Sequence, residues 1–161
     1  MAPVCLTTVI RRIVLSTLTA LLLACSSDNL LAPPADYPHA AAQSVCGPGG
    51  PAVLIYLSPD DWTSMKPFTP FVRIYVPTAS VEALAGRTWT NLTGTDGGAS
   101  AVLQTSELVL ERATAGSLRV SSVSADKTIS GTVDVTFTNG EHVHGGFRAN
   151  YLGQLSACLR M

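Results

Sequence analysis

The stretch ISGTVDVTFTNGEHVHGGFRA, residues 129–149, decides the fold of this chain. Its first half alternates at period two, with apolar residues on one face and polar residues on the other, as in a strand with one buried side. Asn139 and Gly140 follow, and this dipeptide between two such runs is the strongest short-range signal for a β-hairpin. The stretch therefore predicts two antiparallel strands that share one buried face.

The register of this hairpin follows from matching its two faces. A two-residue loop at Asn139 would mix apolar and polar residues on both faces, whereas a three-residue loop over residues 138–140 sets Val135 opposite Val143. Because a slip of one residue inverts every side chain, the agreement of the faces is informative. The sequence therefore predicts a type I turn with Gly140 in the left-handed conformation at a bulge.

The same register places Gly131 opposite Phe147, so that the aromatic ring covers the glycine backbone. Residues 131–137 and 146–149 resemble stretches found in exported β-domains in general. That resemblance is generic and implies no particular function.

The chain before this hairpin carries further short runs separated by turn residues. Strand-like patterns occur at residues 53–57, 71–76, 87–92, 101–112 and 118–123. A short helical turn is predicted at residues 81–85, because Ser80 can cap it and Gly86 can end it. About seven short strands favour an all-β fold, either an antiparallel sandwich or a small barrel.

The N-terminus predicts an export signal. Arg11 and Arg12 precede an apolar stretch over residues 13–24. At about 12 residues it is shorter than the roughly 20 that span a bilayer, and it suits a signal peptide instead. The leader ends in LLAC, residues 22–25, which resembles the lipobox of bacterial lipoproteins. This resemblance implies cleavage before Cys25, attachment of lipid to its thiol and acylation of the new amino terminus.

Three segments follow from these features. Residues 1–24 are the predicted signal peptide, residues 25–45 the lipidated Cys25 with a flexible linker, and residues 46–161 a β-rich domain. The linker is predicted because prolines interrupt it and no periodicity is present. A lipid anchor implies a place in the cell envelope, held on a membrane. Ser26 rather than aspartate follows the cysteine, and the lipoprotein resemblance then implies the outer membrane over the inner.

Two cysteines, Cys46 and Cys158, remain in the predicted domain, since Cys5 leaves with the leader and Cys25 takes the lipid. An even pair in an exported chain favours a disulfide. The bridge would close a loop of about 110 residues, for which loop entropy gives at most about 4.7 kcal/mol of stabilisation. Two free buried thiols, or half of a metal site, are the alternatives.

The hairpin register also brings candidate ligands together. His142 and His144 share the polar face, and Asp134 lies opposite His144. Two histidines and a carboxylate are ligands that zinc and other divalent transition metals accept. The alternative is a solvated sheet face on which His144 pairs loosely with Asp134.

A second candidate site is the acidic pair Asp60 and Asp61 beside Trp62. Such a group can bind a cation or a sugar, or it can cap a turn while the tryptophan packs on the domain. His39 falls in the predicted linker, where a solvated side chain without a role is expected.

Composition narrows the functional classes. Only 13% of the residues are charged, and loss of Arg11 and Arg12 leaves 8 basic against 11 acidic residues. Nucleic-acid binding needs a basic face, so no nucleic-acid partner is expected. Neither a Gly-x-Ser-x-Gly elbow nor a phosphate-binding loop before a helix occurs, and no catalytic residue is predicted.

The sequence therefore favours a non-catalytic envelope module that binds a protein, a glycan or a small ligand, or that has a structural role at the membrane. The alternative is a metal-binding protein or metal-dependent enzyme that uses His142, His144 and Asp134.

Overall fold

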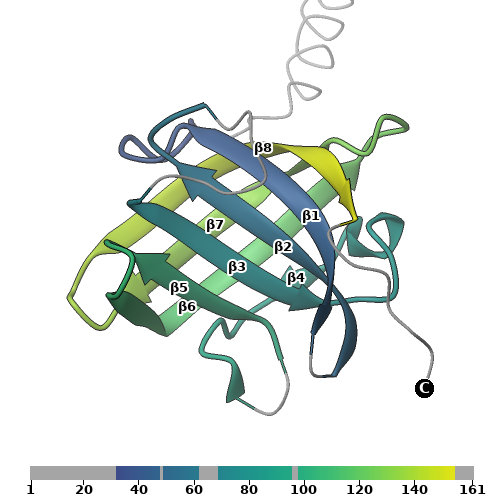
Figure 1. Ribbon diagram of the computed structural model, residues 1–161. Coiled ribbons are helices and arrows are strands. Elements are labelled where there is room, and N and C mark those ends of the chain that lie inside the picture. The colour runs from purple at the N-terminus through teal and green to yellow at the C-terminus, as the bar shows by residue number, and fades with distance from the viewer. Residues whose placement is uncertain (1–31, 48, 62–68, 96–97, 155–161) are drawn as a thin grey trace, which may run out of the picture.

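The computed structural model describes residues 32–47, 49–61, 69–95 and 98–154. Its elements are β1 (His39–Gly47), β2 (Gly50–Ser58), β3 (Phe71–Pro77), the 3-10 turn η1 (Glu82–Leu84), β4 (Thr88–Trp89), β5 (Ser100–Gln104), β6 (Leu110–Val123), β7 (Ile129–Phe137) and β8 (His142–Gln154). The predicted all-β fold is confirmed. Of the two architectures expected, the chain forms the small barrel (Figure 1).

Seven strands close this barrel in the order in which they occur in the sequence. β1, β2, β3, β5, β6, β7 and β8 pair antiparallel in succession, and β8 returns to β1. An up-and-down path through an odd number of strands leaves the first and last pointing the same way. β1 and β8 therefore pair parallel, with Ala41 beside Asn150 and Ala42 beside Tyr151. This closing pair departs from the purely antiparallel sheet that the sequence predicts.

The sixth strand is longer than expected. The ambiguous run at residues 101–112 divides between β5 and β6, and β6 continues to Val123 without the predicted break before residue 118. The first residues of β6 pair with β5, and Leu118 and Arg119 pair with the short β4. β6, with 14 residues, thus pairs with both β5 and β4 along the same edge.

Side chains at alternate positions fill the interior of the barrel. The largest fully buried side chains include Ile55, Leu57, Ile74, Leu103, Leu118, Ile129 and Phe137. A barrel with about this number of strands has an interior just wide enough for side chains. The predicted cover of Gly131 is confirmed, because an added Cβ there would lie 2.8 Å from the ring of Phe147. Ligands must therefore be sought on the outer surface.

The β7–β8 hairpin has the predicted register. Val135 pairs with Val143. Gly140 has a φ of +84°, and its N–H donates to the carbonyl oxygen of Phe137 at 3.0 Å. The type I turn with a left-handed glycine is therefore confirmed.

The predicted linker boundary at residue 45 is wrong, because residues 39–45 belong to β1. Ala42 is fully buried inside the barrel, and Tyr37, just before the strand, is buried too. The hydroxyl of Tyr37 donates to Oε1 of Glu141 at 2.7 Å. The pattern was missed because small alanines form this strand, directly after Pro38, and alanine has a low strand propensity.

The segment before β1, residues 32–38, packs against the start of β8. The N–H of Gly146 donates to the carbonyl oxygen of Ala32 at 2.9 Å. Pro34 is buried, and a Cβ on Gly145 would lie 2.6 Å from its backbone nitrogen. The close approach of these two segments therefore requires glycine at position 145.

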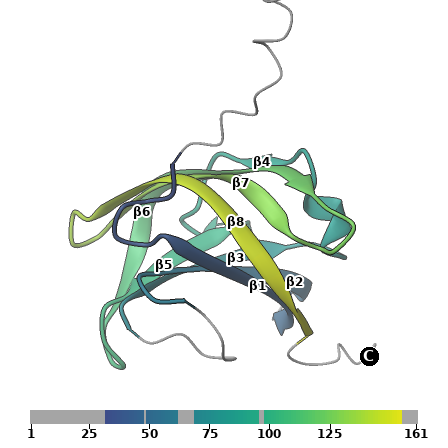
Figure 2. The same ribbon diagram turned by 90° about the horizontal axis from the view of Figure 1, so that it is seen from above.

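The two ends of the barrel carry different segments (Figure 2). We call the end at which β1 begins the amino end. Residues 32–38 and the turns at residues 105–109 and 138–141 lie there, because β5 and β7 end and β6 and β8 begin at this end. The carboxyl end holds the β1–β2 turn, η1 and the last residues of β8. In the part of the chain that the structure describes, no helix has the length and apolar character to cross a bilayer.

We predict that Gly145→Ala destabilises the barrel by about 1–3 kcal/mol, the usual range for overpacking a tight contact. The added methyl group would push residues 32–38 away from β8, because it meets backbone atoms that cannot simply rotate aside. Urea unfolding measures the change. Gly49→Ala is the matched control, since a Cβ at Gly49 has no neighbour within 4 Å. Equal unfolding free energies for the two variants would show that residues 32–38 do not dock there.

Candidate functional site

The hairpin brings Asp134, His142 and His144 together on the outer face of β7 and β8, as the sequence predicts. Nε2 of His142 lies 2.9 Å from Oδ1 of Asp134, and Nδ1 of His144 lies 3.4 Å from Oδ2. The two imidazole rings stack with centroids 6.1 Å apart and an interplanar angle of 20°. One carboxylate thus contacts both histidines.

The closer histidine is not the one directly opposite. Asp134 pairs across the strands with His144, and His142 pairs with Thr136, yet the shorter contact runs diagonally to His142. Diagonal neighbours on a sheet are within reach of long side chains. The register therefore predicted the three members correctly, whereas the side-chain directions decided which pair is tighter.

Hydrogen bonding lowers the pKa of one member of this cluster, Asp134. The hydrogen bond with His142 lowers the pKa of the Asp134 carboxyl from its ordinary value, against an opposing effect of partial burial. The charges of His142 and His144 lower the pKa further. All three side chains are about half exposed, so solvent screens these interactions strongly.

The arrangement matches a polar sheet face more closely than a metal centre. Each imidazole directs one ring nitrogen at the Asp134 carboxylate. Over the described ranges, no group of three His, Cys, Asp or Glu side chains is arranged to hold a metal ion. The hypothesis of a transition-metal site at His142, His144 and Asp134 therefore stays a prediction.

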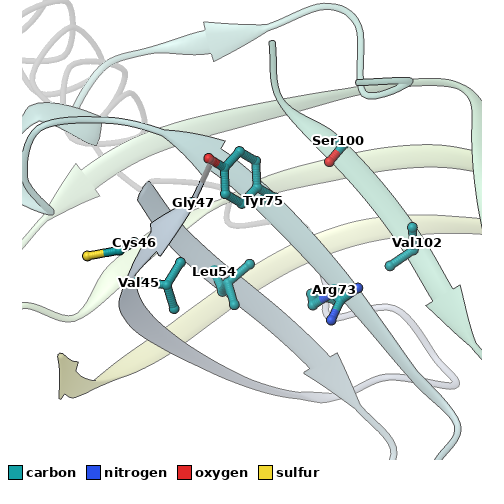
Figure 3. Close-up of a pocket in the computed structure, with 8 residues that line it drawn as sticks. All are labelled: Val45, Cys46, Gly47, Leu54, Arg73, Tyr75, Ser100 and Val102. Atoms are coloured by element: carbon teal, nitrogen blue, oxygen red, sulfur yellow. The ribbon is translucent and has the colours of Figure 1, made fainter. Parts of the chain in front are cut away.

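A groove of about 440 Å³ crosses the outer face of β1, β2, β3 and β5 (Figure 3). Its lining residues are Val45, Cys46, Gly47, Leu54, Arg73, Tyr75, Ser100 and Val102. Figure 3 shows Tyr75 and Arg73 along β3, with Val45 and Leu54 on one flank and Ser100 and Val102 on the other. The walls are mainly apolar, and one guanidinium lies among them.

The charged group of this groove is Arg73, which is half-buried. Within the described segments, the salt bridges are His39–Asp61, Glu82–Lys127 and the two to Asp134, so no carboxylate in them pairs with Arg73. The positive charge of Arg73 acts on the neighbouring Tyr56, whose pKa is raised by burial and lowered to a smaller extent by the guanidinium. A half-buried cation that pairs with no carboxylate of the described residues is suited to bind an anion.

A close contact between β1 and β3 shapes the groove. The ring of Tyr75 lies over Gly47, where an added Cβ would come 2.1 Å from the tyrosine oxygen. Gln43, earlier in β1, is buried and does not line the groove, and its Oε1 has no hydrogen-bond partner among the residues that the structure describes.

Sequence reasoning missed this groove. Leu54, Arg73 and Tyr75 fall within runs that the sequence predicts as strands without assigning their faces, and the structure places them at outward positions of β2 and β3. Leu54 pairs with Tyr75, and Arg73 pairs with Val102, so the groove depends on which strands are neighbours. The period-two alternation of the sequence could have identified the outward positions. It could not show which of these positions become neighbours across the strands.

Of the other predicted residues, Asp60 and Asp61 are not among the lining residues of the groove, whereas Cys46 is one of them. Asp60 and Asp61 are exposed after β2, and Nδ1 of His39 lies 3.9 Å from Oδ1 of Asp61. Trp62 lies outside the described residues, and so do Cys25 and Cys158. Cys46 is exposed near the end of β1. Its disulfide with Cys158 therefore stays a prediction.

No family model, curated protein or solved structure matches this chain. The fold defines the class as a small closed β-barrel with a packed interior. A fold of this kind does not specify a function, which depends instead on the groups that its surface carries.

We predict that His142→Ala raises the pKa of Asp134 more than His144→Ala does, because the hydrogen bond with His142 is the largest cause of the lowered value. A carboxyl with a lowered pKa stabilises the fold above its ordinary pKa, and this stabilisation is lost as the pH falls through the folded value. Carboxyl-carbon NMR titration of the two variants measures the shifts. Equal effects of the two substitutions would contradict the diagonal pairing.

Proposed function

We propose that this chain is a lipid-anchored protein of the cell envelope whose barrel is a non-catalytic binding module. The observation that carries the proposal is the groove on the outer face, because the barrel interior is already filled by its own side chains. The lipobox-like end of the leader supports the anchor, with the outer membrane favoured by Ser26. A Cys46–Cys158 disulfide is part of the proposal.

The anchor would hold the barrel close to the membrane. Seven peptide units separate Cys25 from Ala32, and they span at most about 25 Å. Ala32 is already hydrogen-bonded to β8, so little free chain is left for a linker. A free linker over residues 25–45, as the sequence predicts, would allow a larger distance between Cys25 and the barrel. The distance is limited because residues 39–45 lie in β1 and residues 32–38 pack on β8.

The groove favours a ligand with an apolar body and a negative charge. Val45, Leu54 and Val102 offer apolar contact along its walls. The guanidinium of Arg73 can form paired hydrogen bonds with a carboxylate, sulfonate or phosphate group. Binding pockets commonly combine mostly apolar walls with a few placed polar groups. We therefore assign the groove to an anionic amphiphile or to an acidic, partly apolar segment of an envelope protein.

For the anchor, we predict that Cys25→Ser moves the protein from the membrane fraction to the soluble fraction, because a serine cannot receive the thioether-linked lipid. Membrane fractionation and intact mass of the extracted protein measure the change. Cys5→Ser is the matched control, since Cys5 lies within the leader. A Cys25→Ser protein that stays as firmly membrane-bound as the unsubstituted protein would contradict the anchor.

For the groove, we predict that Arg73→Gln weakens binding of the apolar sulfonate dye 1-anilinonaphthalene-8-sulfonate by roughly three- to tenfold, the loss expected for one hydrogen-bonded contact that solvent partly screens. Fluorescence titration measures the dissociation constant, and circular dichroism checks that the variant is folded. Arg148→Gln is the control, because Arg148 is exposed on β8, away from the groove. An unchanged affinity of Arg73→Gln, or an equal loss in both variants, would refute the assignment.

A further inference from the structure

The turn between β5 and β6 carries three consecutive apolar side chains into solvent. Leu108 is 94% exposed, Val109 is 45% exposed and Leu110 is 52% exposed. Single exposed apolar residues are normal on a protein surface, whereas a contiguous group indicates a site of interaction. We call Leu108, Val109 and Leu110 the apolar tip.

The apolar tip belongs to the amino end of the barrel, the end that also holds residues 32–38. The N–H of Thr138 donates to the carbonyl oxygen of Arg112 at 3.0 Å, which ties the start of β6 to the β7–β8 turn. Glu141 in the same turn accepts the hydrogen bond of Tyr37 from the segment before β1. The apolar tip and the entry of the chain into the barrel are thus linked through one turn.

We propose that the apolar tip inserts into the surface of the bilayer that holds the lipidated Cys25. This inference rests on the proposed function, because the anchor limits the distance between bilayer and barrel. Ala32 lies at the amino end and at most about 25 Å of chain connects it to Cys25. The amino end is therefore the part of the barrel that the anchor keeps nearest to the lipid.

A bilayer explains the shape and size of the apolar tip better than a protein partner does. The tip is a narrow projecting turn, and few side chains are needed because the anchor supplies a high local concentration. An apolar segment held next to a lipid anchor can add its own buried apolar area to membrane attachment. Glu107 and Glu111 flank the tip, so a zwitterionic surface suits it better than an anionic one.

The test uses the lipidated protein, purified from membranes and reconstituted in phosphatidylcholine vesicles whose acyl chains carry bromine. Leu108→Trp places a fluorophore at the apolar tip. Leu152→Trp is the matched control, because Leu152 is also apolar and 40% exposed but lies near the carboxyl end of the barrel. The unsubstituted protein provides the background from its own two tryptophans.

We expect bromine to quench the added fluorescence of Leu108→Trp at least about threefold more than that of Leu152→Trp, because only the tip reaches the acyl chains. Equal or absent quenching in protein that floats with the vesicles would overturn the insertion and leave the anchor intact. A blue-shifted Leu108→Trp emission without bromine quenching would overturn it in favour of a protein partner. Protein without lipid by intact mass would refute both the insertion and the proposed anchor.

Discussion

The rest of the structure depends on the parallel pairing of β1 with β8. It joins the first strand to the last, which lie about a hundred residues apart in the sequence, and gives both of them a second neighbour. Without it the sheet would have two open edges and an uncovered apolar face. Closure turns that face into the packed interior. The groove then lies on the outer wall, where the β1–β2 pairing sets Val45 beside the outward residues of β2 and β3.

The same pairing determines which end of the barrel would face the membrane if Cys25 carries the proposed anchor. β1 begins at His39, so the preceding residues are drawn onto β8, where Ala32 and Pro34 pack against Gly146 and Gly145. The short remaining connection to Cys25 orients the amino end toward the proposed anchor. In the proposed arrangement, the apolar tip faces the bilayer that holds the anchor. The groove on the barrel wall then stays open to the envelope.

Sequence reasoning succeeded where local patterns are strong. The alternation in β7, with Asn139 and Gly140 after it, predicted the hairpin register, and the register placed Asp134, His142 and His144 together. It failed where the signal depends on distant partners. The alanines of β1 carry no apolar pattern, and their strand forms because β2 and β8 offer edges to pair with. The groove was missed for the same reason, since Arg73 and Val102 become neighbours only through pairing.

Closure is tested most directly by NMR on the isotope-labelled protein. The account predicts cross-strand nuclear Overhauser effects between the backbones of Ala41 and Asn150 and of Ala42 and Tyr151, together with slow hydrogen exchange of the β1 amides. If the β1 amides exchange as fast as those of an unstructured chain and no such effects to β8 are seen, the barrel is open. Residues 39–45 would then be the linker that the sequence alone predicts.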